Sequence, residues 1–325
     1  MLISRRRFVA ATAALPFMAH VYAQTYPVRP IRLVIPFPPG GAFDAVGRPW
    51  ADKMKGLLGT LVVENIGGGG SSIGASVVAR AKPDGYTVLL GGTQTHVNEA
   101  LLKTKQLYDP LKDLDPVAGL VAYPLCIAVH PSLPMRTLKE LVAYAKANPG
   151  SLSYGHAGLG SIQHLTGELF KSLTSTAGIV QVPYRGTGPA ITDLIGGQIP
   201  MAVLGLTGQV IELHRANRMR VIAVTSPNRL SAAKELPTAA EMGFPQVNVR
   251  GSIGVLAPAG TPKEAIERIA QATRTALTDR SFQQLFIDAG MEPTVDTGPE
   301  QFRKSLAADI ALWSPVVKAL GVKID

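Results

Sequence analysis

The sequence predicts an α/β protein with mainly parallel sheets flanked by helices, arranged as two lobes with a ligand cleft between them. From Ile31 onward, short β-rich runs bounded by glycine and proline alternate with segments of helical period. The alternation resumes near residue 150, and 325 residues suffice for about two domains of ~150 residues each. An export signal and a single cysteine, Cys126, indicate a secreted chain without an internal disulfide.

Residues 1–23 predict an export signal that is absent from the working protein. Ser4-Arg5-Arg6-Arg7-Phe8 is followed by a short apolar run to Ala19 and by the cleavage pattern Val21-Tyr22-Ala23. The run is shorter than the ~20 apolar residues that span a bilayer, and no lipobox precedes a cysteine. A twin-arginine signal and an arginine-rich Sec signal both fit. We therefore expect a periplasmic protein that begins at Gln24.

The charge pattern argues against a nucleic-acid partner. The formal net charge of +9 falls to +6 once the three arginines of the signal are removed. The remaining basic residues are scattered, without four in a row and with few aromatic neighbours. Attraction of small anions remains a reasonable consequence of the positive charge.

Eight β-rich segments are predicted as strands. They are Ile31–Pro36, Leu61–Val63, Tyr86–Leu90, Val117–Ala128, Leu152–Tyr154, Ile179–Val182, Ile199–Leu204 and Met219–Val224. Helical patterns lie between the first of them, at about Ala45–Leu58 and Ile73–Ala81. This order predicts parallel strands covered by helices on both faces.

Three Thr-x-x-Glu sequences predict helix starts, because this spacing forms a capping box. They begin at Thr137, Thr238 and Thr261, and in the last Pro262 would occupy the first helical position. A long C-terminal helix is predicted from Pro299. Its apolar face carries Phe302, Leu306, Ile310, Trp313, Val317 and Leu320 at spacings of three and four, so we expect these side chains in the core.

The first glycine-rich loop, Pro36–Asp44, closes a strand and opens a helix. Gly40 and Gly41 allow a sharp turn that exposes backbone N–H groups at the helix start, and we expect a positive φ at Gly41. Those N–H groups and the helix dipole suit a carboxylate or phosphate. Asp44 is expected to fix the loop rather than to bind the anion. The alternative is an ordinary strand-to-helix turn.

The second glycine-rich loop, Asn65–Gly74, contains Gly70-x-Ser72-x-Gly74, which is formally a nucleophile-elbow pattern. That motif requires a strand directly before the serine, whereas the strand here ends at Val63. An exported serine hydrolase that uses Ser72 or Ser161 is therefore the alternative of another class, and we expect no enzyme activity.

The third loop, Gly155–Glu168, leads into a helix with Ile162, Leu165 and Leu169 on its buried face. Ser161, His164 and Glu168 share another stripe of that helix. Two interpretations remain open: contact with a ligand, or a serine N-cap followed by a histidine–glutamate pair on the surface.

The fourth glycine-rich turn, Val182–Ala190, places Tyr184 and Arg185 before a helix. These side chains are predicted either as a pocket wall and a counter-ion or, for the arginine, as a solvated loop residue. We expect no metal and no cofactor, because no ligand cluster is formed by His20, His96, His130, His156, His164 and His214.

Five short motifs occur in the order found in one family. They are Pro39-Gly-Gly-x-x-Asp44, Lys82-Pro-Asp-Gly-Tyr86, Gln163-His-Leu-x-Gly-Glu168, Val182-Pro-Tyr-Arg-Gly186 and Leu256-Ala-Pro-Ala-Gly-Thr-Pro262. With them the mature chain resembles the Bug family of periplasmic solute receptors, which serve tripartite tricarboxylate transporters. The resemblance implies a monomeric receptor of the type II-like periplasmic-binding-protein fold, with a small carboxylate ligand and the membrane subunits of such a transporter as partners. A dicarboxylate, an acidic amino acid or an aromatic carboxylate would fit.

The resemblance also implies lobe boundaries and ligand-binding positions. Lobe 1 would comprise residues 24–125 and 250–325, and lobe 2 residues 126–249. The expected ligand-binding residues are Phe37, Pro39, Gly40, Gly41, Ala42, Phe43, Asp44, Thr93, Thr95, Gly158, Gly160, Ser161, His164, Tyr184, Arg185, Gly186, Thr187, Thr207, Gly208, Arg250 and Ser252.

The chain departs from the family pattern in places that bear on the ligand. Ala202-Val-Leu204 replaces Met-Phe-Asp, and Ser252 stands where a tryptophan often occurs. The loss of that tryptophan would widen the pocket, and Arg250 beside it offers a partner for a second carboxylate. A receptor that signals to a membrane sensor is the remaining alternative.

Overall fold

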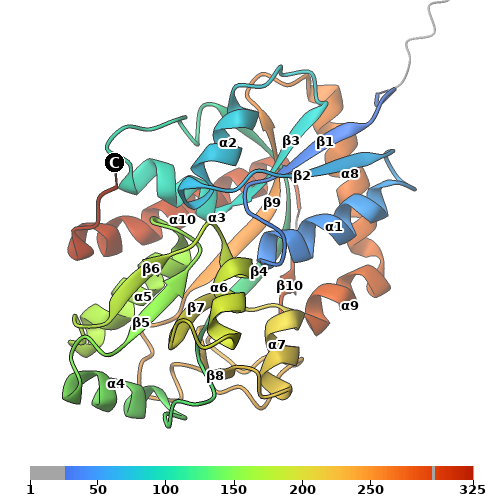
Figure 1. Cartoon of the computed structure of the whole chain (residues 1–325). Helices are drawn as coiled ribbons and strands as arrows, with labels where there is room; N and C mark the ends of the chain where they lie inside the picture. The colour runs from blue at the N-terminus through green and yellow to red at the C-terminus, as the bar shows by residue number, and fades with distance from the viewer. Residues whose placement is uncertain (1–25, 295–296, 325) are drawn as a thin grey trace, which may run out of the picture.

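The computed structural model describes residues 26–294 and 297–324, so the predicted signal segment and its cleavage site lie outside the described residues. Within this part of the chain, no helix is both long and apolar enough to cross a membrane. Two groups of strands are joined by the two longest strands, β4 and β9, and helices flank both groups (Figure 1).

Lobe 1 is the part built on the first three strands, β1 (Ile31–Ile35), β2 (Leu61–Asn65) and β3 (Thr87–Gly92). They are parallel in the order β2-β1-β3 and are followed by β9 (Arg250–Pro258) and β4 (Leu114–Val129). A short strand, β10 (Glu292–Pro293), pairs with β4. The flanking helices are α1 (Ala42–Met54), η1 (Gly69–Ser71), α2 (Ser72–Ala79), α3 (Thr93–Val97), η2 (Asn98–Leu102), α8 (Lys263–Thr278), α9 (Arg280–Asp288) and α10 (Pro299–Leu320).

Lobe 2 is the part built on β5 (Ser153–His156), β6 (Val180–Pro183), β7 (Met201–Gly205) and β8 (Arg220–Val224). Strand β5 is parallel to β6 and β7, whereas β7 and β8 pair antiparallel with β4. Its helices are α4 (Leu138–Ala147), α5 (Ile162–Thr174), α6 (Thr187–Ile195) and α7 (Gly208–Arg215).

Strand β4 belongs to both lobes. Its residues 114–124 pair with β9, and its residues 125–129 pair with β7 and β8. The partner strand β9 begins at Arg250, opposite Pro124. The two-lobed α/β fold is therefore confirmed, but the sheet is mixed, because the strands that connect the lobes run antiparallel to their neighbours.

The C-terminal helix α10 confirms the prediction of a buried apolar face. Phe302, Leu306, Trp313 and Val317 are at most 5% exposed, and Ile310 is half-buried. Helix α10 contacts β4, the strand that both lobes share, and also α3 of lobe 1 and α5 of lobe 2. Burial of such side chains at roughly 1.5–3 kcal/mol each holds α10 across the connection between the lobes.

Two of the three predicted capping boxes differ from expectation. Thr137 and Glu140 cap α4 reciprocally, as predicted. Thr238 and Glu241 make both capping hydrogen bonds, at 2.8 and 3.1 Å, but only turns follow because the chain reaches Gly243 and Pro245. The third box does not form: the hydroxyl of Thr261 donates to the carbonyl oxygen of Pro258, and α8 begins after Pro262 without a side-chain cap.

Strand β9 has no counterpart among the predicted strands. Gly251, Ser252 and Gly254 interrupt its β-rich character. The strand exists because it lies between β3 and β4 and pairs with both. At Gly254, a Cβ would overlap the ring of Phe302. Tertiary packing thus selects residues that lack strand propensity.

Candidate functional site

The loop between β1 and α1 turns on Gly40, whose φ of +91° lies in the left-handed region. The expectation of a positive φ at Gly41 is wrong: its φ is −105°, and it is the N-cap residue of α1. Because Gly41 has no side chain, the first-turn N–H groups of α1 have no side-chain cap. These groups and the positive end of the helix dipole form a place for an anion.

Asp44 fixes this loop, as expected, and its carboxylate is fully engaged. One carboxylate oxygen accepts from the N–H of Gly40 at 3.3 Å. The other accepts from Arg48 at 2.9 Å and from the amide of Asn65 at 3.2 Å. Asn65 also donates to the carbonyl oxygen of Phe37 at 2.8 Å. The acid therefore braces both ends of the loop, and Arg48 balances its charge.

The first turn of α6 in lobe 2 lies against this loop. A Cβ on Gly41 would stand 2.5 Å from the hydroxyl oxygen of Thr187, and one on Gly186 would stand 2.7 Å from Pro38. A Cβ on Gly40 would stand 3.6 Å from the Cα of Gly188, at van der Waals distance. Helix α6 starts at Gly186 and, like α1, has no side-chain cap. The uncapped N-termini of two helices, one from each lobe, therefore meet here.

A groove with a volume of about 580 Å³ opens beside this contact. Its lining includes Pro39, Gly40, Tyr184, Gly188 and Gln209. On the inner side, aromatic rings follow the loop. Phe37 and Phe43 lie 4.9 Å apart between ring centroids, and Phe43 lies 6.5 Å from Tyr123. These three rings are buried in the core and do not line the groove, whose aromatic side chain is that of Tyr184.

The loop Gly158–Ser161 faces a different part of lobe 1. Gly158, with a φ of +118°, lies against Gly70, and Gly160 lies against Asn98. Ser161 is fully buried and caps α5 by accepting from the N–H of His164 at 3.0 Å. Its predicted role as an N-cap is confirmed. The nearest lobe 1 neighbours of Gly158 and Gly160 thus include Gly70 and Asn98 rather than Gly40 and Gly41.

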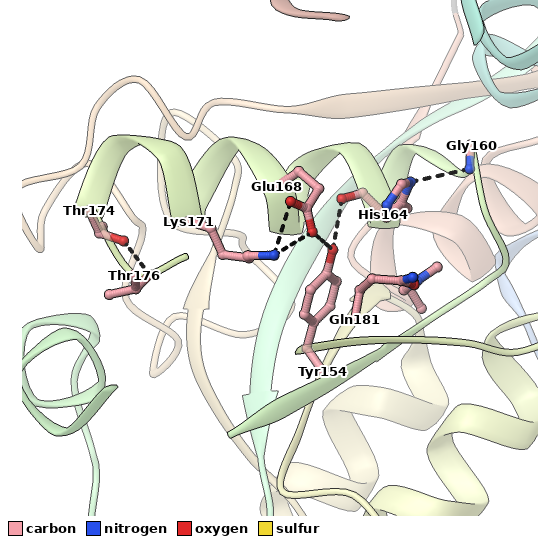
Figure 2. Close-up of polar contacts among 9 residues, drawn as sticks. Tyr154, Gly160, His164, Glu168, Lys171, Thr174, Thr176 and Gln181 are labelled. Carbon is pink, nitrogen blue, oxygen red and sulfur yellow. Dashed lines mark hydrogen bonds and ion pairs between the residues drawn. The ribbon is translucent and has the colours of Figure 1, made fainter. Parts of the chain in front are cut away.

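The predicted surface pair of His164 and Glu168 does not exist. His164 is 5% exposed, accepts from the N–H of Gly160 at 3.2 Å and stacks on His156 at 4.7 Å. Glu168 instead accepts from the hydroxyl of Tyr154 at 2.8 Å and pairs with Lys171, as Figure 2 shows. Desolvation, followed by the neighbouring His156, lowers the pKa of His164 to about 4.

Of the other predicted residues of lobe 2, some bond to neighbouring residues of the same lobe and one, Arg185, is exposed. The Tyr184 hydroxyl donates to Asp193 at 2.7 Å, and burial followed by this bond raises the pKa of Tyr184 to about 12. Arg185 is exposed and has no hydrogen bond or ion pair among residues 26–294 and 297–324. Thr207 caps α7 through the N–H of Val210, and Gly208 faces Ala289 of lobe 1.

Thr93 and Ser252 form a polar cluster with Asp309 of α10. The Thr93 hydroxyl donates to Asp309 at 2.5 Å, and the Ser252 hydroxyl donates to it at 3.2 Å. Desolvation raises the pKa of Asp309 despite these bonds. Thr95 bonds within its own turn, to Gly92. Ser252 thus supports α10.

Arg250 pairs with Glu292 rather than standing free for a ligand. The guanidinium lies 3.0 Å from the carboxylate of Glu292, and both side chains are about half exposed. The pair joins the start of β9 to β10. It gives Arg250 a structural role at the connection between the lobes.

The sequence interpretation missed two buried residues at the boundary of the lobes. Gln94 is 1% exposed and bonds to both lobes. Tyr123 is 1% exposed, and its hydroxyl oxygen has no hydrogen-bond partner among the described residues. Tyr123 could have been noticed from the sequence, because it places a hydroxyl group within an apolar run. No sequence pattern marks Gln94 as different from other glutamines.

The two candidate serines lack the partners of a nucleophile. The Ser72 hydroxyl accepts from Asn98 at 3.0 Å, and the Ser161 hydroxyl accepts from a backbone N–H. No imidazole bonds to either hydroxyl in the part of the chain that the structure describes. In the same part, no group of three or more His, Cys, Asp and Glu side chains could hold a metal ion.

Comparison with known proteins finds relatives whose similarity extends over nearly the whole chain. BugT of Bordetella pertussis is 35% identical over 308 residues, which cover 94% of each chain. The solved structure of the periplasmic binding protein BugD is 32% identical, with a TM-score of 0.87, and covers 92% of this chain and 99% of BugD.

Two similar solved structures contain ligands. MatC from Rhodopseudomonas palustris, with bound malate, is 29% identical with a TM-score of 0.85 and covers 90% of this chain and 100% of MatC. Rpa4515 of R. palustris, with adipate, is 33% identical with a TM-score of 0.87, and it covers 92% of this chain and 99% of Rpa4515.

The family to which these relatives belong consists of receptors rather than enzymes. Its members are periplasmic, bind small carboxylates and work with the membrane subunits of a transporter. The sequence model of the family described as "Tripartite tricarboxylate transporter family receptor" matches residues 46–322. The chain therefore belongs to the TctC family of tripartite tricarboxylate transporter receptors, which includes the Bug proteins.

Proposed function

We propose that this protein is an extracytoplasmic receptor that holds a small carboxylate between the uncapped N-termini of α1 and α6. The observation that carries the proposal is the approach of Gly41 to Thr187, which brings two sets of helix N-terminal N–H groups from opposite lobes together. Each terminus carries roughly half a positive charge. A carboxylate can accept from both without any cationic side chain.

Binding would couple the ligand to closure of the lobes. We propose that lobe 1 comprises residues 24–125 and 250–325 and that lobe 2 comprises residues 126–249. Support comes from β4, which changes partners between Pro124 and Leu125, and from the start of β9 at Arg250. These two segments would form the hinge, and the ligand would stabilise the closed arrangement because both lobes contact it.

An aliphatic dicarboxylate is the ligand class that we propose. The related structures of MatC with malate and of Rpa4515 with adipate support this class. Arg250 is paired with Glu292, so of the two candidate arginines we propose Arg185 as the partner of the second carboxylate. Hydroxyl groups near the contact, such as that of Thr187, would supply further hydrogen bonds.

The transport role rests on the family. We propose that the receptor works as a monomer and delivers its ligand to the membrane subunits of a tripartite tricarboxylate-type transporter. We also propose that residues 1–23 direct its export to the periplasm and are then removed. The family model and the periplasmic relatives support this role.

Thermal unfolding of the protein from residue 24 onward, with and without carboxylates, tests the proposed ligand class. Malate, adipate, glutamate and benzoate form the panel, and adipamide serves as the uncharged match of adipate. At 100 times its Kd, a ligand adds about 2.7 kcal/mol to the free energy of unfolding. We expect stabilisation by a dicarboxylate and none by adipamide. Equal stabilisation by adipamide, or none by any carboxylate, would contradict the proposal.

A further inference from the structure

A second contact between the lobes is built around the amide of Gln94, in the first turn of α3. Its Nε2 donates to the carbonyl oxygen of Gly70 at 3.1 Å, within lobe 1, and to that of Gly160 at 3.4 Å, in lobe 2. Its Oε1 accepts from the N–H of Ile162 at 2.8 Å. The side chain is 1% exposed, so these bonds are protected from water.

The chemistry of this contact requires a primary amide. Gly160 presents a carbonyl oxygen, and Ile162, at the start of α5, presents an N–H group. A carboxylate has no donor for the first, an ammonium group has no acceptor for the second, and an apolar side chain leaves both unsatisfied. An unsatisfied buried polar group costs about 1–3 kcal/mol. The donor and acceptor of the Gln94 amide therefore favour the arrangement in which lobe 2 is hydrogen-bonded to this side chain of lobe 1.

Neighbouring residues hold the two loops in place for this contact. The amide of Asn98 donates to the carbonyl oxygens of Gly69 and Gly70, at 2.9 and 3.1 Å, and to the Ser72 hydroxyl. Gly70 in turn lies against Gly158 of lobe 2. This contact shares no residue with that between Gly41 and Thr187, and none of these three hydrogen bonds of Gln94 reaches the first loop.

We propose that Gln94 is a positioning residue that stabilises the closed arrangement of the lobes without touching the ligand. The inference rests on the proposed function, since closure matters because it traps a ligand. Affinity for any ligand falls by the factor by which the closed population falls, because ligand binds productively to that population. Loss of Gln94 would thus weaken every ligand equally and leave the order of preference unchanged.

The test compares Gln94→Met, which keeps the length but removes both hydrogen-bonding functions, with Gln271→Met as the matched control. Gln271 lies on the exposed face of α8, and its side chain accepts hydrogen bonds from Arg274 within the same helix. Gln94→Asn, which keeps the amide one methylene shorter, is a second variant should the first fail to fold. All measurements are made on the ligand-free protein, so they do not depend on the identity of the ligand.

Hydrogen exchange at the Ile162 amide reports the contact directly. We expect at least about tenfold faster exchange in Gln94→Met, the change expected for loss of one or two buried hydrogen bonds. The amide of His164, which bonds to Ser161 within lobe 2, is the internal control. Equal exchange at Ile162 in the wild-type and variant proteins would overturn the proposal, as would equal acceleration at His164, which indicates local unfolding.

Closure is measured by energy transfer between dyes on Lys146→Cys in α4 and Thr275→Cys in α8. Both positions are exposed, and the native Cys126 is fully buried and therefore unlabelled. We expect the ratio of closed to open molecules to fall about tenfold in Gln94→Met and to stay unchanged in Gln271→Met. An unchanged ratio in Gln94→Met would contradict the proposal. Because the readout needs no ligand, it succeeds or fails independently of the carboxylate screen.

Discussion

Thr187 of lobe 2 stands directly opposite Gly41 of lobe 1, with its hydroxyl oxygen 2.5 Å from the position that a Cβ on Gly41 would occupy. Each of these residues starts a helix that has no side-chain cap. The glycine is therefore required by the closeness of the lobes rather than by its own φ of −105°. The N-cap residues of the two helices, Gly41 and Gly186, have no side chain, so the first-turn N–H groups of both helices lack a side-chain cap.

Gly41→Val is predicted to abolish carboxylate binding while the protein remains folded. The added side chain would collide with Thr187 and keep the lobes apart, whereas the core of lobe 1 does not involve this position. We expect affinity in calorimetry to fall more than 100-fold, about 2.7 kcal/mol, with a cooperative unfolding transition retained.

The matched control for this variant is Gly56→Val. Gly56 also lies in lobe 1, its φ is outside the left-handed region, and no heavy atom lies within 4 Å of its hypothetical Cβ. Its affinity is expected to equal that of the wild-type protein. Unchanged affinity in Gly41→Val would remove the first loop as the anchor.

Asp44→Asn is predicted to weaken every carboxylate ligand by the same modest factor. The carboxylate braces Gly40, Arg48 and Asn65 and does not face the anion, so its loss loosens the loop. We expect about a fivefold loss of affinity, about 1 kcal/mol, as for one hydrogen bond. Asp52→Asn is the control, because Asp52 is exposed and pairs with Lys55, one turn away in the chain. A changed order of ligand preference would mean that Asp44 contacts the ligand.

Arg185→Ala and Arg250→Ala separate charge pairing from backbone recognition. Arg250 is already paired with Glu292, so its removal should leave the affinity for adipate unchanged. Arg185 is exposed, where ion pairs contribute about 0–1 kcal/mol, so its loss should cost less than tenfold. A loss above ~2 kcal/mol for either arginine in calorimetry would show that a side-chain cation dominates the binding energy.

Stability is predicted to decline as the pH falls from 6.5 towards 4. Desolvation lowers the pKa of both His96 and His164 from 6.5 to about 4. In this range the unfolded chain binds more protons than the folded one, so the free energy of unfolding decreases by up to about 1.4 kcal/mol per pH unit for each imidazole. His164→Gln should give a shallower decline in denaturant titrations. A slope equal to that of the wild-type protein would contradict the assignment.

Export predicts that the working protein begins at Gln24. The basic start, the short apolar run and the Val21-Tyr22-Ala23 pattern are the features of a cleaved signal. Mass spectrometry of the protein recovered from the periplasm should therefore find no residue before Gln24. A working protein that retains Met1–Ala23 would overturn the periplasmic assignment.

The sequence predicted the elements whose pattern is local. The apolar face of α10, the strand β4 and the serine cap of α5 follow from periodicity and from capping chemistry within a few residues. The first glycine loop was identified in the same way. The positive φ was expected at Gly41 but occurs at Gly40. Either of two adjacent glycines can adopt a positive φ, and tertiary contacts decide which one does.

The remaining features depend on residues that are distant in the sequence. Strand β9 is stabilised by two neighbouring strands, and Gln94 becomes significant only when α5 lies beside α3. His164 was expected either to contact a ligand or to pair with Glu168 at the surface, yet it is buried and packs against His156 from β5. The proposed site depends on the contact between Gly41 and Thr187, which belong to two loops far apart in the sequence, so local periodicity could not predict it.

Backbone amide spectra of the protein from residue 24 onward, titrated with adipate and with malate, test the central claim most directly. A carboxylate bound between α1 and α6 should move the amide protons of Ala42, Phe43, Thr187 and Gly188 downfield more than any others, because these groups would donate to it. Saturation by either ligand with these four amides unmoved, and with the largest shifts elsewhere, would contradict the account.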